Sequence, residues 1–313
     1  MNNIRVRVPA TSANLGAGFD SFGLALCLYN EIEIVPGEPG VTVHSDDANQ
    51  ISSGTDNIAW QAARRLLEKL DCSTDFYLQM WNSIPLSRGL GSSAAARVGA
   101  LVAANEWARR KTGQSATQQQ LLNLATELEG HPDNAAAALL GGLTVAVVAD
   151  SESKSTPEYG RTFALQMPVK SFPRFLVFSP DSHLETKTAR AALPAMVSHA
   201  DAVFNLSRAG LLLAALQTGD LETLPEALKD RLHQNQRASL LPGWNELTNA
   251  AHDSGALGIT LSGAGSSILF WLPRDEATFA RAENAVRDAA KKADVAGALR
   301  ELQVDLDGAV VLE

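Results

Sequence analysis

A glycine-rich segment in front of an alanine-rich run is the strongest chemical signal in the sequence. Residues 88–94 read Arg-Gly-Leu-Gly-Ser-Ser-Ala, and they follow a strand-like run and open a stretch with helical periodicity. The first turn of a helix has free backbone N–H groups and the positive end of the helix dipole, and glycines let a phosphate approach the backbone. The segment matches neither a Walker A loop nor a GxGxxG fingerprint. We therefore expect a phosphate site of another kind; the alternative is a tight turn before a packed helix.

Polar residues that could do chemistry gather at three other points. Residues 127–134, Glu-Leu-Glu-Gly-His-Pro-Asp-Asn, come at the end of a predicted helix and could bind Mg²⁺, orient a substrate or simply cap the helix. Thr11, Asn14 and Asp20 are the polar members of a small, apolar turn, and Asn and Asp are also ordinary turn formers. A second glycine segment, 262–267, lies between two strand-like runs, where close backbone packing explains it nearly as well as binding.

Hydrophobic periodicity predicts the elements that must position these residues. In the first half we predict strands at 4–8, 26–35, 76–82 and 143–149, and helices at 56–70 (capped by Asp56), 94–111, 117–129 (behind a Thr117–Gln120 capping box) and 133–140. In the second half we predict strands at 162–167, 174–180, within 256–272 and near 300–312, and helices at 186–192, 199–217, 244–253 and 275–292. Strands and helices mix without a strict βαβ alternation, which favours an α+β class.

Length and composition set the limits of the interpretation. The 313 residues suggest two domains, 1–160 and 161–313, with a boundary in the polar segment 150–160. With 45% hydrophobic and 19% charged residues, the chain is typical of a globular protein. The net charge of -9 argues against nucleic-acid binding, and two cysteines without ligand spacing favour neither disulfides nor zinc, as expected in the cytoplasm. We predict no signal peptide and no membrane segment.

Four segments match a known family in order and spacing. They are VPATSANLGAGFDSFGLAL, PLSRGLGSSAA, EGHPDNAAAALLGG and GITLSGAGSSILF. Together they resemble the GHMP kinase superfamily over nearly the whole chain, and TARAALP at 188–194 and RASLLPG at 237–243 are similar to its homoserine-phosphorylating branch. The resemblance implies a two-domain α+β fold: an N-terminal domain like the second domain of ribosomal protein S5 and a ferredoxin-like C-terminal domain. It also implies transfer of a phosphoryl group from MgATP to L-homoserine in threonine biosynthesis; homodimerisation is an expectation from the family.

The resemblance further implies roles for individual residues. The nucleotide loop would comprise Pro85, Leu86, Ser87, Arg88, Gly89, Leu90, Gly91, Ser92, Ser93, Ala94 and Ala95. The amino-acid pocket would comprise Asn14, Asp20, His131, Arg190 and Arg237, with the two arginine forks on the substrate carboxylate.

The implied metal and catalytic groups are carboxylates and a serine. Glu129 would bind Mg²⁺ together with Ser93 or Ser92; Glu127 is an alternative, because some family members have a longer insertion before Asp133. Asp20 or Asp133 could accept the hydroxyl proton, but a route through the γ-phosphate would need neither.

Other functions remain alternatives at this point. A GHMP kinase for a sugar would leave Arg190 and Arg237 without a partner, mevalonate has no ammonium group, and an ATP-dependent decarboxylase could share the fold. A serine hydrolase would use Ser92 or Ser93 with His131 and Asp133; we expect this His and Asp to be too close in sequence for an orienting hydrogen bond, and the G-x-S-x-G elbow is missing. A non-catalytic sensor would bind the ligands without turnover.

Overall fold

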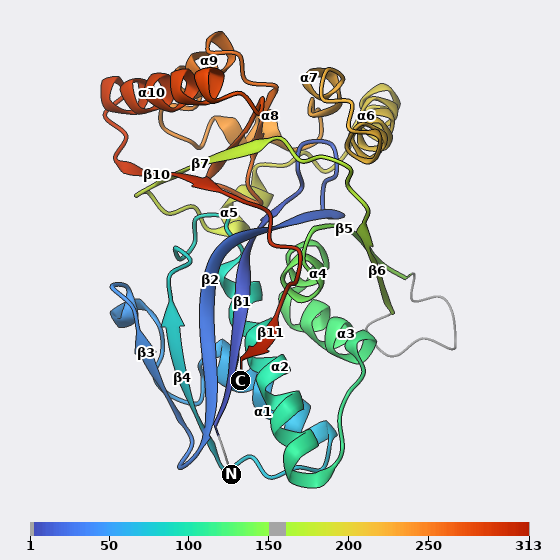
Figure 1. The fold of residues 1–313 in the computed structure, drawn as a ribbon, viewed down its shortest axis with the longest axis vertical. Helices are drawn as coiled ribbons and strands as arrows, with labels where there is room; N and C mark the ends of the chain where they lie inside the picture. Colours follow the sequence, from blue (N-terminus) through green and yellow to red (C-terminus); the bar gives the residue numbers. More distant parts are fainter. Residues whose placement is uncertain (1–2, 150–160, 313) are drawn as a thin grey trace.

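The larger of two β-sheets holds most of the first half of the chain. The computed structural model describes residues 3–149 and 161–312, so the expected boundary segment 150–160 lies outside the described residues. Seven strands form this sheet in the order β11-β1-β2-β4-β3, with β5 on β2 and β6 on β5 (Figure 1). The strands are β1 Ile4–Ala13, β2 Phe22–Pro36, β3 Gly40–His44, β4 Phe76–Asn82, β5 Leu143–Val148, β6 Thr162–Met167 and β11 Val310–Leu312.

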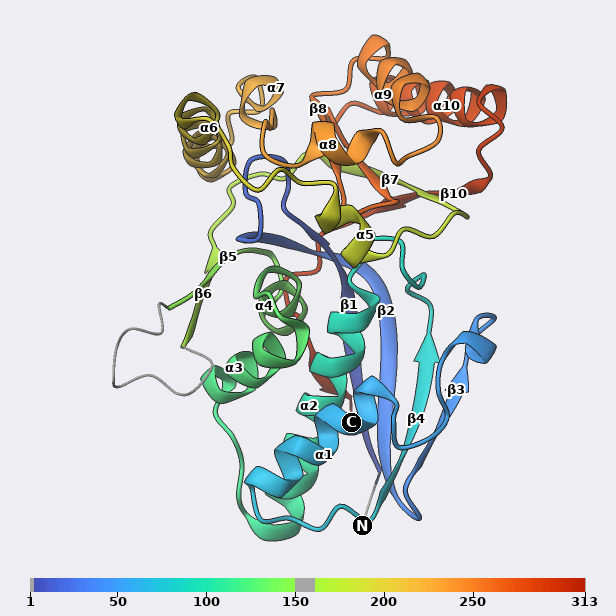
Figure 2. The same cartoon turned by 180° about the vertical axis from the view of Figure 1, so that it is seen from behind.

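Four helices cover one face of this sheet, as the view from behind makes plain (Figure 2). They are α1 Ile58–Lys69, α2 Ser92–Thr112, α3 Gln118–Glu129 and α4 Asp133–Leu140; a short 3₁₀ helix, η1 Ala48–Gln50, follows β3. In α2 most of the buried residues are alanine or glycine, which lets the helix lie close to both α1 and the sheet. The sheet presents alternating buried residues such as Ile4, Val6 and Val8 to this layer, so the core lies between sheet and helices.

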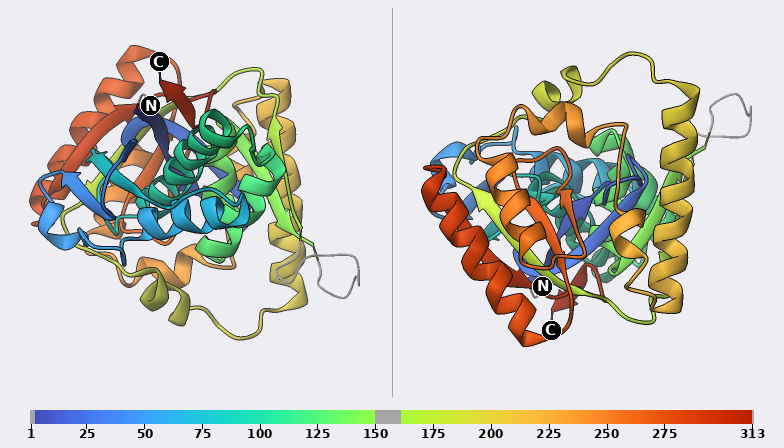
Figure 3. Two further views of the ribbon diagram at one scale, coloured as in Figure 1. Left: turned by 90° about the horizontal axis from the view of Figure 1, so that it is seen from below. Right: turned by 90° about the horizontal axis from the view of Figure 1, so that it is seen from above.

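The second sheet has four antiparallel strands in the order β10-β7-β9-β8. They are β7 Arg174–Pro180, β8 Gly258–Leu261, β9 Ile268–Leu272 and β10 Gly297–Leu302, and the helices between them are α5 Thr186–Ala191, α6 His199–Thr218, α7 Leu224–Ala227, α8 Gln234–Ala238, α9 Trp244–Asp253 and α10 Glu276–Lys292. This strand order is that of a ferredoxin-like βαββαβ unit, with α5–α9 in the first connection. Seen from above and below, α6 and α10 lie on opposite flanks (Figure 3).

The α+β class and the main predicted elements are confirmed, with local corrections. Asn57, not Asp56, caps α1, because its side chain accepts from the N–H groups of Ala59 and Trp60. The strand predicted at 4–8 continues to Ala13, because residues 10–13 still pair with β2 beyond an irregularity after Pro9. The sequence reasoning missed β3, η1, α7 and α8, which are short.

The division into 1–160 and 161–313 stays a prediction. In chain order the predicted boundary falls between β5 and β6, which are paired strands of one sheet, and β11 returns from the C-terminal end to pair with β1. The first sheet is therefore built from separate parts of the chain. None of the described helices is both long enough and apolar enough to cross a bilayer.

Candidate active site

The glycine loop between β4 and α2 has a backbone that only glycine fits at Gly91. This residue has φ 68° and precedes the first turn of α2, and a Cβ there would lie 1.9 Å from Thr11 Oγ1. Because a glycine cap has no side chain, no side-chain hydrogen bond caps this helix end. Gly91, Ser92 and Ser93 line a cavity of about 150 Å³, so the positive end of α2 opens into it. This arrangement suits an anion.

The second glycine segment, 262–267, supports this loop from behind. A Cβ on Gly89, which has φ 77°, would lie 2.2 Å from the carbonyl oxygen of Ser262. The Ser262 hydroxyl donates to the Gly89 carbonyl at 2.7 Å, and the Ser267 N–H donates to the Arg88 carbonyl at 2.9 Å. The glycines of both segments therefore permit a close backbone approach between the two sheets. Gly263 and Ala264 also line the cavity, so the segment is close to any ligand there.

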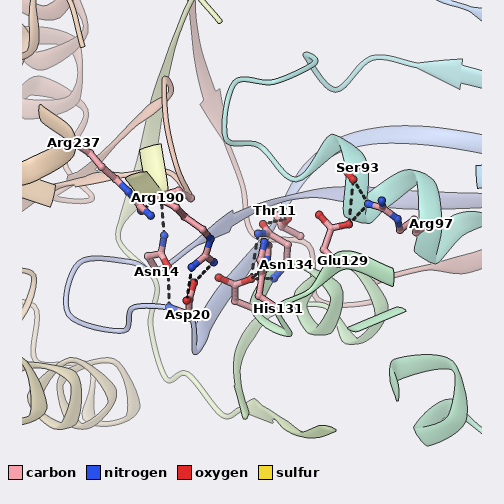
Figure 4. Close-up of polar contacts among 12 residues, drawn as sticks. Thr11, Asn14, Asp20, Ser93, Arg97, Glu129, His131, Asn134, Arg190 and Arg237 are labelled. Atoms are coloured by element: carbon pink, nitrogen blue, oxygen red, sulfur yellow. Dashed lines mark hydrogen bonds and ion pairs between the residues drawn. The ribbon is translucent and has the colours of Figure 1, made fainter. Parts of the chain in front are cut away.

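The cavity collects most of the predicted site residues. The glycine loop contributes Ser87 to Ser93 to the lining of this cavity. The rest of the chain contributes Asn14, Asp20, Glu129, His131, Asp133, Arg190 and Arg237, several of which are shown in Figure 4. Pro85, Leu86, Ala94 and Ala95 are not among its lining residues, and the last two are buried in the core. Asn134, the last residue of the polar segment 127–134, lines it too. Thr186 also lines it, although the sequence reasoning gave it no role.

Asp20 and Arg190 form a two-pronged ion pair at one end of the cavity. The Arg190 nitrogens donate to the Asp20 oxygens at 2.7 and 2.9 Å, and this hydrogen bonding raises the pKa of Arg190. Asn14 holds the Asp20 loop: its Oδ1 accepts from the Asp20 N–H at 2.9 Å, and its Nδ2 donates to the Gly263 carbonyl at 2.8 Å. Both carboxylate oxygens of Asp20 are therefore engaged by a cation.

Arg237 is a buried cation, and one edge of its guanidinium group makes no hydrogen bond within the described residues. Its side chain is 1% exposed, and it donates to the carbonyls of Ala189 at 3.3 Å and Gly263 at 3.2 Å. Burial lowers the pKa of Arg237, yet a guanidinium starts so high that it stays charged at neutral pH. Its Nη2 has no hydrogen-bond partner within residues 3–149 and 161–312. A buried cation of this kind is stabilised by an anion in the cavity.

Asp133, at the first residue of α4, holds one oxygen in a network of donors. Its Oδ1 accepts from the Asn134 N–H at 2.7 Å and lies 2.9 Å from His131 Nδ1. The expectation that these neighbours are badly placed for such a bond is wrong, because the chain turns at Pro132 and starts α4 immediately. Thr11 Oγ1 in turn donates to Asn134 Oδ1 at 2.7 Å. In the described part of the chain, Asp133 Oδ2 has no hydrogen-bond partner.

His131 has a raised pKa for electrostatic reasons. Burial by itself lowers the pKa of this imidazole, but the hydrogen bond to Asp133 and the negative charges of Asp133 and Glu129 outweigh that effect. The neighbouring carboxylates therefore favour the protonated form of His131. The Ser93 hydroxyl donates to Glu129 at 3.1 Å and not to His131, which is unlike the nucleophile–base pair of a serine hydrolase.

Glu129 and Ser93 form the candidate metal site. Their carboxylate and hydroxyl oxygens suit Mg²⁺, which usually takes one or two carboxylates plus substrate phosphates and water. Across the described residues there is no cluster of three or more His, Cys, Asp or Glu side chains for a metal, so phosphate oxygens would have to complete the shell. Glu127 instead pairs with Arg65. Arg97, one turn after Ser93, contacts both Ser93 and Glu129, and the sequence reasoning missed it.

A second cavity, of about 310 Å³, lies on the other side of the same loop. It shares Ser87, Ser92 and Ser93 with the first cavity, and its further lining residues are Gln50, Ile51, Ser52, Asp56, Asn57, Ile58, Met80, Asn82, Leu86 and Ala96. The buried Asn82 Oδ1 has no partner among the residues that the structure describes. No sequence motif indicated this cavity, because its walls come from the start of α1, the end of β4 and the segment around η1.

The sequence and the fold are similar to those of known proteins. The family model of the GHMP kinases N terminal domain matches residues 57–142, and that of the GHMP kinases C terminal region matches 212–292. A homoserine kinase of Desulfitobacterium hafniense is 42% identical over 313 residues, 99% of this chain and all of the relative, and one of Gloeobacter violaceus is 43% identical over 84% of this chain and 86% of the relative. A crystal structure of a homoserine kinase from Cytophaga hutchinsonii has a TM-score of 0.87 at 26% identity and covers all of this chain and 98% of its own.

Proposed function

Because this chain belongs to the homoserine kinase family of the GHMP kinases, we propose that it transfers the γ-phosphoryl group of ATP to the side-chain hydroxyl of L-homoserine. The products are O-phospho-L-homoserine and ADP. The observation that carries the substrate assignment is the cavity itself, where a helix N-terminus for phosphate faces two guanidiniums and a carboxylate. An amino acid with a hydroxyl group matches those charges, whereas a sugar does not.

ATP would span the two cavities. The mostly apolar second cavity suits the adenine ring, with the unpartnered Asn82 Oδ1 available to its exocyclic amino group. The loop residues Ser87, Ser92 and Ser93 line both cavities, so the phosphates would follow the loop into the first one. Free N–H groups at the start of α2 would hold the γ-phosphate there.

Homoserine would occupy the Arg237 end of the first cavity. The unengaged edge of Arg237 is the best-placed donor for the carboxylate, because Arg190 already forms two hydrogen bonds with Asp20. Both Asp20 oxygens accept from Arg190, so Asp20 would attract the ammonium group through its charge, which Arg190 reduces. With the carboxylate at Arg237 and the ammonium group at Asp20, the homoserine hydroxyl can point at the γ-phosphate near Asp133 and His131.

Asp133 is the better of the two carboxylates for accepting the hydroxyl proton. Both Asp20 oxygens hold Arg190, whereas donors hold only Oδ1 of Asp133. In the reaction the hydroxyl oxygen bonds to the γ-phosphorus, the bond from that phosphorus to the bridging oxygen breaks, and ADP leaves with the electron pair. The hydroxyl proton moves to Asp133 Oδ2.

Asp133→Asn tests the proton acceptor against Asp20→Asn. We expect Asp133→Asn to lower kcat by about 10² to 10⁴ with little change in either KM, since proton transfer contributes at that level. Asp20→Asn should mainly raise the KM for homoserine. If Asp133→Asn kept wild-type kcat, the proton would have to leave by the γ-phosphate oxygen instead.

Glu129 and Ser93 would hold Mg²⁺, which neutralises phosphate charge when it is bound. Glu129→Gln tests this role, and Glu127→Gln is the matched control two residues away on the same helix. We expect Glu129→Gln to raise the Mg²⁺ concentration needed for half-maximal rate by ten-fold or more, on the order of one lost charged contact. Glu127→Gln should leave it unchanged. The reverse pattern would assign the metal to Glu127.

Substrate choice is tested by ADP release in the presence of MgATP and a panel of alcohols. The panel is L-homoserine, L-serine, L-threonine, mevalonate and galactose. Turnover confined to homoserine is the expected result, and equal or faster turnover of mevalonate or galactose would reject the pocket assignment while keeping a kinase.

The oligomeric state and the cellular location rest on less evidence than the reaction. We propose a homodimer in the cytoplasm, on the strength of the family likeness alone. Light scattering after size-exclusion chromatography tests the first point, since a monomer at micromolar concentration would reject it. Fractionation of the source cells tests the second.

A further inference from the structure

His233 is a buried histidine beside the site to which the reaction gives no task. We propose that it is a positioning residue, held between the Gly16 carbonyl and the Arg237 guanidinium, which fixes Arg237 where the substrate carboxylate binds. The inference rests on the proposed function, because it assigns that carboxylate to Arg237. It extends that function by naming what keeps the arginine in place.

The two nitrogens of His233 face groups of opposite kind. Nε2 lies 2.9 Å from the Gly16 carbonyl oxygen, and Nδ1 lies 3.3 Å from Arg237 Nη1. A carbonyl can only accept and a guanidinium can only donate, so Nε2 must carry the proton and Nδ1 must offer its lone pair. The contacts therefore require the neutral ring. His233 is 0% exposed, which leaves water no access to either nitrogen.

The backbone around His233 is fixed as firmly as the ring. Asp230 Oδ2 accepts from the N–H groups of His233 at 2.9 Å and Gln234 at 2.7 Å, and Asn205 Nδ2 donates to Asp230 Oδ1 at 2.6 Å. The Arg237 N–H donates to the His233 carbonyl one helical turn earlier, at 3.1 Å. Asp230 therefore sets the start of α8, and α8 sets the spacing between His233 and Arg237.

Phe19 completes the support from the Asp20 loop. Its ring stacks on His233 with centroids 5.0 Å apart, and the Arg237 guanidinium carbon lies 5.3 Å from the Phe19 centroid. The Arg190 guanidinium carbon lies 5.8 Å from the same centroid. One aromatic ring thus contacts both cations, which favours their close placement in spite of like charge. The loop that supplies Asp20 and the helix that supplies Arg237 are joined through His233 and Phe19.

The charges around His233 make this support dependent on pH. Burial lowers the pKa of His233, the neighbouring Arg237 lowers it further, and Asp230, Asp20 and the Gly16 carbonyl act in the opposite direction. Asp230 comes only within 3.8 Å of Nε2, too far for a hydrogen bond. A proton on Nδ1 would remove the lone pair and place a second cation against Arg237. Protonation of His233 should therefore weaken the carboxylate site.

Two substitutions and a control separate positioning from general stability. His233→Leu removes both hydrogen bonds, His233→Asn can keep an acceptor near the Nδ1 position, and His252→Leu changes an exposed histidine on α9. We expect His233→Leu to raise the KM for homoserine about ten-fold or more, the value of one hydrogen bond to a charged group, with the KM for ATP within about two-fold. His233→Asn should recover part of that loss, and His252→Leu should match the wild type.

The pH profile supplies the second readout. For the wild type we expect the KM for homoserine to rise only at a pH well below 6.5, the ordinary pKa of histidine, because burial lowers the pKa of His233, and His233→Asn should lose that rise. An unchanged acid rise in His233→Asn, or equal increases in both KM values for His233→Leu, would overturn the inference; the first comparison holds even if His233→Leu does not fold. A wild type that fails to phosphorylate homoserine at any pH would reject the proposed function instead.

Discussion

At the scale of single residues, the backbone at Gly91 decides whether the glycine loop before α2 can pack against Thr11. We predict that Gly91→Ala destabilises the protein by about 3 kcal/mol or more, because left-handed backbone costs alanine about 1–2 kcal/mol and the new Cβ would overlap Thr11. Gly113→Ala at the other end of α2 is the control, since it has φ 80° but no heavy atom within 4 Å of its Cβ. Urea unfolding measures both. Equal losses would mean that the contact with Thr11 is unimportant.

His131 gives a residue-scale prediction with the opposite pH dependence to that of His233. Because its folded pKa is raised, His131 contributes stability that is present below the unfolded pKa of about 6.5 and lost as the pH rises through the folded pKa. His131→Asn should therefore lower the free energy of unfolding by about 1–2 kcal/mol at pH 6, the value of a hydrogen bond to a charged group, and by less at pH 9. Denaturant titrations at the two pH values measure the difference. A larger loss at pH 9 would contradict the sign.

At the scale of elements, the start of α3 controls the helix that carries Glu129. The Thr117 side chain accepts from the Gln120 N–H, and the Gln120 side chain accepts from the Thr117 N–H, which confirms the capping box expected from the sequence. We predict that Thr117→Ala costs about 1 kcal/mol of stability without changing kcat, because Glu129 lies at the far end. Thermal unfolding measures this, with the exposed Ser115→Ala just outside the helix as control. A large fall in kcat would show that fraying reaches Glu129.

At the scale of the whole molecule, the two sheets meet where the glycine segments touch. Ser262→Ala removes the hydrogen bond to the Gly89 carbonyl, whereas Ser266→Ala in the same segment removes an equally short one, 2.7 Å, to the Ser182 carbonyl. We predict that both lose about 1–2 kcal/mol of stability, but that only Ser262→Ala also raises the KM for ATP, by several-fold. Thermal unfolding and steady-state kinetics measure the two effects. An equal rise in KM for Ser266→Ala would mean that the segment acts as one unit.

The sequence by itself determined the features that depend on neighbours along the chain. Periodicity identified the main helices and strands, and the capping box at Thr117 identified the start of α3. The glycine loop before α2 predicted an anion site, and this loop lines the first cavity. These features follow from backbone sterics and hydrogen bonds within a few residues, which are the same in any context. Four ordered motifs added the family, and so the general class of reaction.

Only the tertiary structure decided which side chains pair. Asp20 was a predicted proton acceptor, and Arg190 was a predicted ligand of the substrate carboxylate. The two residues are 170 positions apart, so no local sequence pattern shows that they bind each other. The same holds for Glu127, which turns to Arg65 while Glu129 faces the cavity. The sequence analysis missed Arg97, His233 and the second cavity for the same reason. Charges and buried polar groups choose partners by distance in space, and that distance exists only once the two sheets have packed together.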